Sequence, residues 1–286
     1  MITPIDPGDL VKHVCLPGDR NMFLNGAPMG STRMPVLFIG HGSPMNAIED
    51  NEFSQAWREV GKSLPRPKGI VVISAHWETQ GTLVTVMDKP RTIHDFYGFP
   101  RPLFEFNYPA PGDPVLAEHI SNLVKTSDVN PDLQWGLDHG SWSVLARLFP
   151  EADIPVVQMS LDRAQGLPFH FELGRQLQAL RDEDVLIIGS GNVVHNLRMM
   201  VWEERIYDWA ADFDSKIKQW ILEGDTDSII HYEKYGHPAE LSVNTEEHYL
   251  PLLYVLGLKH PQDTISFFNE KVWGGSLSMR CVQFSA

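Results

Sequence analysis

Apolar residues along this chain fall into short runs that alternate with amphipathic stretches. Phe53, Trp57 and Val60 recur at helical spacing between two of these runs. Three runs have the length of a strand and are almost uniformly apolar, as in strands buried on both faces of a sheet: residues 34–39 (MPVLFI), 69–74 (GIVVIS) and 184–190 (DVLIIGS). The alternation predicts a single α/β domain with a central mixed or parallel sheet flanked by helices.

Capping residues and prolines indicate where several of these elements begin or end. Asp50 and Asn51 are candidate caps for the helix that carries Trp57, and Pro65 ends it. A second helix is predicted to start near Ser141. Thr245 is a candidate cap for a third, whose first turn would carry His248. Further elements are expected over residues 208–222 (helix), 264–268 (strand) and 276–284 (strand).

The first 33 residues differ from the rest of the chain. They are rich in Pro, Gly and Asp and lack a sustained apolar period, which predicts a flexible N-terminal extension over residues 1–33. An alternative is that Met29, just before the first strand, is the natural start. Residues 34–286 are expected to form one catalytic domain.

Composition and charge narrow the function classes. The chain has 286 residues, of which 43% are hydrophobic and 21% charged, as in an ordinary globular protein of one large domain. Its net charge of −14 argues against nucleic acid and anionic membranes as partners, because binding phosphates requires clustered Lys and Arg. No signal peptide or membrane span is recognisable, so we expect a cytoplasmic protein. The sequence carries no indication of its oligomeric state.

Four histidines stand out by their position among the twelve. His41, His76 and His195 each follow a strand-like run, and His248 lies beside a predicted helix. Ligands of α/β sheets gather where strands end, so these four side chains are predicted to converge on one metal ion. The alternative for any single histidine is a surface or hydrogen-bonded core residue. Three in the same local context favour the shared site.

His139 follows Asp138 in the motif DHGSW, at the entry to a predicted helix. It is a candidate general acid or base, with Asp138 or a backbone carbonyl orienting its ring. The alternative is a histidine that only forms local hydrogen bonds at the start of the helix.

Residues 88–114 contain six prolines and several aromatic residues, which predicts a long loop without helix. Loops of this length in compact domains are usually functional. His94, Asp95 and Tyr97 are therefore candidate substrate-binding residues. An equally weighted alternative is a proline-stiffened cover with His94 at the surface.

Together these motifs resemble those of the LigB-type (class III) extradiol ring-cleavage dioxygenases, in particular the DOPA extradiol dioxygenase branch. The resemblance runs from about Ser31 to the C-terminus. It rests on five motifs in order: GHGSP at 40–44, SAHW at 74–77, DHGSW at 138–142, GNVVHN at 191–196 and EHYLP at 247–251.

The resemblance implies one divalent metal held by His41, His76, His195 and His248, with His139 or His195 as the acid–base catalyst. It also implies a catechol such as DOPA and dioxygen as substrates, and a seco-DOPA or muconic semialdehyde-type product. More distant members have a carboxylate where His248 falls. An all-imidazole site suits zinc, whereas oxygen activation requires a redox metal. Zinc in the isolated protein and Fe(II) in catalysis are therefore both expected.

Other classes remain open from the sequence. A four-histidine zinc site also suits a hydrolase that activates water. A strand followed by Gly-His-Gly-Ser is similar to the opening of tetrapyrrole metal chelatases. A non-catalytic relative would bind metal and leave catechols unchanged.

Overall fold

A mixed sheet forms the centre of the computed structural model, which describes residues 33–203 and 205–286. Within these residues the sheet has eight strands in the order β4-β3-β5-β2-β6-β1-β10-β7. Its strands are β1 (Val36–Gly40), β2 (Gly69–Thr79), β3 (Thr82–Thr85), β4 (Val129–Asp132), β5 (Val156–Asp162), β6 (Val185–Gly191), β7 (Thr264–Phe268) and β10 (Cys281–Ser285). A separate pair is formed by β8 (Val272–Trp273) and β9 (Leu277–Ser278).

The centre of the sheet is parallel and its flanks contain antiparallel pairs. Strands β5, β2, β6 and β1 run parallel to one another, whereas β10 is antiparallel to β1 and β7, and β3 is antiparallel to β5. The carboxyl ends of four adjacent central strands therefore lie along one edge. The predicted α/β class with a mixed sheet is confirmed.

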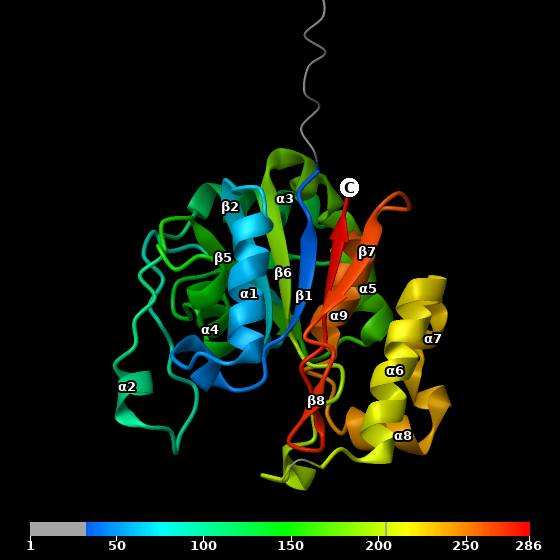
Figure 1. Cartoon of the computed structure of the whole chain (residues 1–286). Coiled ribbons are helices and arrows are strands. Elements are labelled where there is room, and N and C mark those ends of the chain that lie inside the picture. The colour runs from blue at the N-terminus through cyan, green and yellow to red at the C-terminus, as the bar shows by residue number, and fades with distance from the viewer. Residues whose placement is uncertain (1–32, 204) are drawn as a thin grey trace, which may run out of the picture. The chain divides into compact units, whose positions relative to one another are not determined.

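Helices cover both faces of this sheet (Figure 1). The α-helices of the described residues are α1 (Glu52–Ser63), α2 (Arg101–Phe104), α3 (Pro114–Leu123), α4 (His139–Leu148), α5 (Leu167–Gln176), α6 (Asp208–Glu223), α7 (Thr226–Ile230), α8 (His237–Ser242) and α9 (Leu250–Leu258). Short 3₁₀ helices are η2 (Pro44–Ala47), η3 (Gln178–Glu183), η4 (Leu197–Met199) and η5 (Tyr232–Tyr235).

Alternation along the strands divides the buried side chains into two cores. Leu37 and Ile39 of β1 belong to the core that contains Trp57 of α1 and Trp142 of α4. Their neighbours on the strand belong to the opposite core, which α5, α9 and α6 cover. Because successive side chains of a strand point to opposite faces, a strand between two helical layers must be apolar throughout. This explains the uniform apolar runs in the sequence.

Helix α1 begins and ends as the sequence predicts. The Asn51 side chain accepts hydrogen bonds from the backbone N–H of Phe53 and Ser54, and the Ser54 hydroxyl accepts one from the Asn51 N–H. The helix ends at Ser63, before Pro65. These bonds satisfy amide groups that the first helical turn leaves unpaired.

Three local predictions are corrected. Helix α4 begins at His139 and not near Ser141, because Asp138 caps it by accepting from the Ser141 N–H. His248 precedes α9, which begins at Leu250, so it does not lie in a first helical turn. The segment 88–114 contains the short helix α2 within its loop.

Residues 1–32, almost all of the predicted extension, lie outside the described residues. Arg33 forms an ion pair with Asp182 at 2.9 Å. In the part of the chain that is described, none of the helices combines the length and apolar character that a bilayer span requires.

Candidate functional site

Five histidines converge at the carboxyl edge of the central strands. His41 directly follows β1, His76 lies in β2, His139 opens α4, His195 follows β6 and His248 precedes α9. Ring centroids are 5.0 Å apart for His41 and His76, 3.8 Å for His76 and His139, and 5.3 Å for His41 and His248. Side chains separated by more than 200 residues thus form one cluster.

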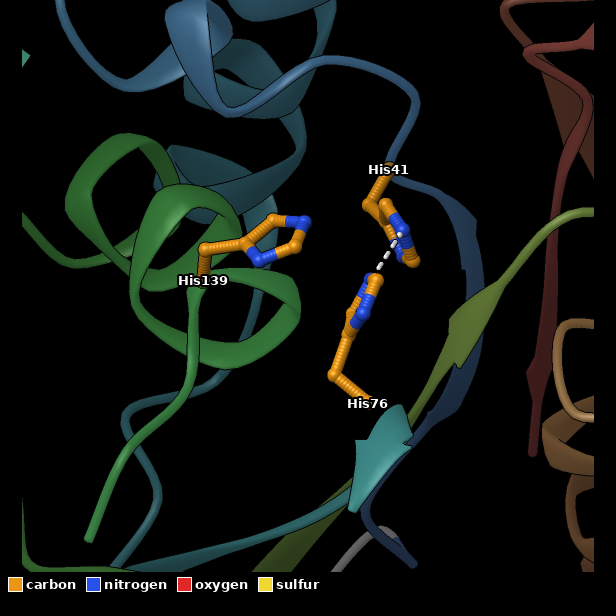
Figure 2. Close-up of side chains that lie close together, drawn as sticks. All are labelled: His41, His76 and His139. Carbon is orange, nitrogen blue, oxygen red and sulfur yellow. Dashed lines mark hydrogen bonds between the residues drawn. The ribbon is translucent and has the colours of Figure 1, made fainter. Parts of the chain in front are cut away.

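The first triad consists of His41, His76 and His139 (Figure 2). One nitrogen of each ring lies within 4.8 Å of the other two. The Nε2 atoms of His41 and His76 face each other at 3.1 Å. Two nitrogens that each bind zinc at about 2.0–2.1 Å in tetrahedral geometry are roughly 3.3 Å apart. The pair therefore fits a metal ion as a shared partner.

The second triad consists of His195, Glu247 and His248. Their ligand atoms also lie within 4.8 Å of one another. The rings of His195 and His248 stack with centroids 3.4 Å apart and planes 7° apart. The four histidines predicted as ligands are therefore present in one cluster but divided between two triads. Glu247 was missed as a member, although its place next to His248 was a usable signal.

Ser190 fixes the ring of His41. Its hydroxyl donates to the Gly140 carbonyl at 2.6 Å and lies 3.0 Å from Nδ1 of His41. Because the hydroxyl proton is already used, the oxygen accepts from Nδ1–H, and Nε2 of His41 keeps a free lone pair toward His76. Such partners of ligating histidines set both ring orientation and tautomer.

Gly140 lets α4 approach β2 closely enough to form the site. A Cβ atom at this position would lie 2.5 Å from Ser74 Oγ and 2.9 Å from a ring carbon of His76. Both distances are shorter than a carbon contact allows. The glycine in DHGSW is thus required for packing against His76.

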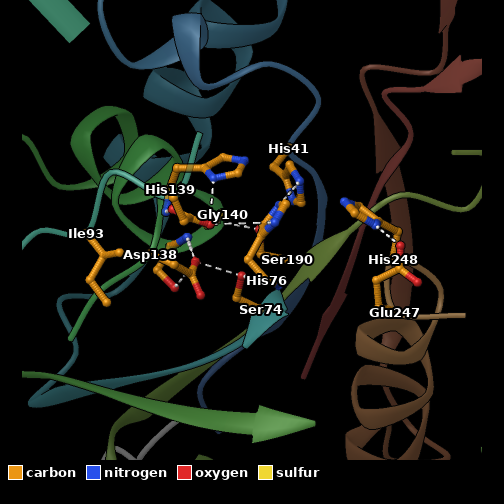
Figure 3. A network of polar contacts seen from close by, with 12 residues as sticks. His41, Ser74, His76, Ile93, Asp138, His139, Gly140, Ser190, Glu247 and His248 are labelled. Atoms are coloured by element: carbon orange, nitrogen blue, oxygen red, sulfur yellow. Dashed lines mark hydrogen bonds and ion pairs between the residues drawn. The ribbon is translucent and has the colours of Figure 1, made fainter. Parts of the chain in front are cut away.

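Asp138 links the start of α4 to β2 and β5 through hydrogen bonds (Figure 3). It is fully buried and accepts from the Ser74 hydroxyl at 2.8 Å and from the Ser141 N–H at 3.0 Å, and Gln158 donates to its other oxygen. Burial and the charge of Asp95 raise its pKa. The hypothesis that Asp138 orients the His139 ring is wrong, since its oxygens bond these other groups.

Asp95, and not Asp138, orients the His139 ring. Its two carboxylate oxygens accept from the backbone N–H and from Nδ1 of His139, each at 2.9 Å. Burial alone would raise the pKa of Asp95, but the hydrogen bonds and charge of His139 lower it overall. Asp95 is thus brought into the histidine cluster.

The other two candidates of the 88–114 segment make different contacts from those of Asp95. His94 Nε2 is 2.9 Å from the Phe106 carbonyl, so its ring bonds within its own segment. Tyr97 is 91% exposed. Phe96, which sequence reasoning did not select, places its ring edge-on to His139 with centroids 5.7 Å apart.

The electrostatics of the cluster favour neutral imidazoles. Burial lowers the pKa of His41 and His248 well below the ordinary value, and neighbouring histidines lower it further. Burial likewise lowers the pKa of His76 to about 3 and of His195 to about 4. Neutral rings offer lone pairs, which is the form that metal ions bind.

A cavity of about 810 Å³ opens beside the turn that carries His41. Its lining includes Asn46, Phe99, Trp273 and Met279. Asn46 donates to the His41 carbonyl at 3.1 Å, and a Cβ at Gly42 would touch the Met279 sulfur. The volume lies within the range of small-molecule sites.

Comparisons with known proteins agree with this geometry. Residues 35–274 match the family model described as the catalytic LigB subunit of aromatic ring-opening dioxygenase. A protein of Escherichia coli K12 named 4,5-DOPA dioxygenase extradiol is 49% identical, over 89% of this chain and 96% of the relative. One of the same name from Beta vulgaris is 39% identical, over 88% and 96%.

A solved structure shows the same fold. It is the crystal structure of an uncharacterized protein from Escherichia coli K12, with a TM-score of 0.77 and 44% identity. The match covers 88% of this chain and 99% of the other.

Proposed function

The chain belongs to the LigB family of aromatic ring-opening dioxygenases, and from this premise we propose that it opens a catechol ring next to the diol, with DOPA as substrate. The proposed product is seco-DOPA, a muconic semialdehyde-type chain. The observation that carries the proposal is the convergence of neutral histidines at the strand ends, with two Nε2 atoms 3.1 Å apart. Relatives named as DOPA dioxygenases support the substrate.

The proposed metal ligands are His41, His76, His195 and His248. Hydrogen bonds support two of these ligands, since Ser190 holds His41 and the Glu247 carboxylate accepts from Nδ1 of His248 at 3.0 Å. Both arrangements leave Nε2 free as the ligand atom. We propose Fe(II) as the catalytic metal, with zinc bound when iron is absent, because imidazole suits both ions.

When bound, a redox-active metal supplies the electron transfer from the catechol to dioxygen. The chain supplies the proton transfers. His139 is the proposed acid–base residue, because Asp95 fixes its ring beside the ligand His76. It accepts a proton from a catechol hydroxyl on Nε2 and returns one to an oxygen atom as the ring opens. The apolar ring of Phe96 lies edge-on beside it, with centroids 5.7 Å apart.

The 88–114 segment is the proposed wall for the amino-acid side chain of DOPA. His94 and Tyr97 flank Asp95 and Phe96 and are its candidate contacts. A Tyr97→Phe variant tests this: KM should rise for DOPA and stay unchanged for unsubstituted catechol. A KM that is equal to that of the native protein for both would remove Tyr97 from the proposal.

The function is tested by oxygen consumption. Metal-stripped protein is reloaded anaerobically with Fe²⁺ or Zn²⁺ and mixed with DOPA or simple catechols. We expect oxygen uptake and a new yellow product with iron alone, and none in His41→Ala. No uptake with either metal across these catechols would contradict the proposal and favour a zinc hydrolase or a metal-binding protein without catalysis.

A further inference from the structure

Asp95 forms two hydrogen bonds with His139, and neither depends on a bound substrate. The two residues are 44 positions apart, and Asp95 belongs to the 88–114 segment whereas His139 opens α4. Both carboxylate oxygens are used on the same partner, one on the backbone N–H and one on Nδ1, each at 2.9 Å. The Asp95 side chain is only 17% exposed.

The hydrogen bond from the His139 N–H to Asp95 stabilises the start of α4. The N–H of His139 is one of the amide groups that the first turn of a helix leaves without a partner. Asp138 caps the Ser141 N–H, so Asp95 supplies a second acceptor and a negative charge at the positive end of α4. The bond therefore fixes where the backbone of His139 stands.

The side-chain bond sets the tautomer of the ring. An ionised carboxylate has no proton to donate, so Nδ1 of His139 must carry the hydrogen. In the neutral ring, Nε2 then keeps its lone pair. In Figure 2 the His139 ring is turned toward His41 and His76. The Asp95 oxygen that accepts from His139 also lies 3.7 Å from Nδ1 of His76. This oxygen therefore lies between the proposed base, His139, and the proposed ligand, His76.

We infer that Asp95 is a positioning residue, which holds His139 with Nε2 directed at the metal ligands and ready to accept a proton. It replaces Asp138, which is used in the junction beneath the site, and it does not bind substrate. This inference rests on the proposed function for its kinetic consequence, but its structural consequence can be observed without any reaction.

The first test compares tautomers in the metal-free protein. In Asp95→Asn, the amide oxygen can still accept from the His139 N–H, but the amide nitrogen donates to Nδ1 and forces the hydrogen onto Nε2. Nitrogen NMR of the His139 ring is expected to show the Nδ1–H form in the native protein and the Nε2–H form in the variant. The same form in both would overturn the inference, whatever the activity of the protein.

The second test separates kcat from KM in the iron-loaded protein. A misplaced acid–base residue is expected to lower kcat about 100-fold to 10,000-fold, with metal content unchanged and KM for DOPA within about threefold. Glu105→Gln is the matched control, because Glu105 is exposed in the same segment and pairs with Arg101. A raised KM with native kcat would instead identify Asp95 as a substrate contact.

A third variant tests whether a loss of activity comes from the missing carboxylate or from a loss of structure. Asp95→Ala is assayed with and without added formate, a small carboxylate that can occupy the vacated position. Recovery of at least about tenfold in kcat is expected if the carboxylate only positions the ring. Absence of recovery in a variant with a native unfolding temperature would overturn the inference. If the native protein itself takes up no oxygen, the proposed function fails and the NMR result still decides the role of Asp95.

Discussion

The two triads at the strand ends differ in what holds their side chains. In the first triad, His41 and His139 are fixed by partners from other elements, Ser190 of β6 and Asp95 of the 88–114 segment. In the second triad, His248 is held by its neighbour in sequence, Glu247, whose carboxylate also accepts from the exposed Thr245 at 2.8 Å. The first triad is thus fixed by the tertiary fold and the second mainly by local contacts.

The first triad is therefore the preorganised half of the site. Partners anchored in rigid elements set ligand geometry before metal arrives, whereas local contacts on a connecting segment leave more of the ordering to the metal. We expect metal affinity to depend steeply on Ser190, which supports the proposed ligand His41, and less on Glu247, which supports the proposed ligand His248.

The largest effect is expected for removal of a first-triad ligand. His41→Ala should lose the metal on dialysis and lower oxygen uptake by more than about 100-fold, because even partners of ligands cost 10-fold to 100-fold. Metal analysis and an oxygen electrode measure both. His119→Ala is the control, since His119 lies at the surface beside Glu183. Full metal retention in His41→Ala would show that His41 is not a ligand.

A smaller loss is expected when a support of the first triad is removed. Ser190→Ala deletes the hydroxyl between His41 and Gly140 and should weaken metal binding by about 10-fold to 100-fold. Competition with a chelator measures the affinity. Ser143→Ala provides a control at a buried serine of α4 whose hydroxyl has no partner among the described residues. Equal affinities in the two variants would contradict preorganisation by Ser190.

The corresponding change in the second triad should reduce metal affinity less. Glu247→Gln keeps the size of the side chain and removes the charge that orients His248, and we expect about a tenfold loss of metal affinity at most. The exposed neighbour serves as reference through Glu246→Gln. A loss larger than that of Ser190→Ala would reverse the comparison and make the second triad the more tightly supported half.

The smallest effect on activity is expected at a histidine outside both triads. His170 of α5 is buried with Nδ1 3.1 Å from the Tyr254 hydroxyl, and burial lowers its pKa to about 4. Below pH 6.5 the unfolded chain binds a proton at His170 that the folded chain does not. Its contribution to stability is therefore full above pH 6.5 and is lost as pH falls toward 4.

Denaturant unfolding at pH 7 and pH 5 measures this contribution. Relative to the native protein, His170→Gln should lose less stability between these pH values, by up to about 2 kcal/mol, since one pKa unit corresponds to about 1.4 kcal/mol. Oxygen uptake at pH 7 should change little. An identical pH dependence in both proteins would show that His170 titrates normally when folded.

The sequence predicted the framework of this molecule better than its contacts. Uniformly apolar runs predicted the central strands, and Asn51 and Pro65 predicted the limits of α1, because strand burial and helix caps depend on nearby residues. The strand-end rule brought His41, His76 and His195 to one edge. Each of these inferences needs only the local sequence and the topology of an α/β sheet.

The partners of the histidines were not predictable in the same way. Asp95 pairs with His139 across 44 positions, and Ser190 reaches His41 across 149, so no spacing rule connects them. The hypothesis that adjacent Asp138 orients His139 followed sequence proximity and was wrong. His248 was assigned to a helix because Thr245 can cap one, yet the chain turns there and α9 begins at Leu250.

The most direct test of the account is the mass and oxygen stoichiometry of the product that iron-loaded protein forms from DOPA. Extradiol cleavage predicts one dioxygen consumed per DOPA and a product with the mass of DOPA plus two oxygen atoms, or that mass less one water after ring closure. A product two hydrogen atoms lighter than DOPA would indicate oxidation to a quinone without ring opening. That result would contradict the assignment of the histidine cluster as a ring-cleaving site.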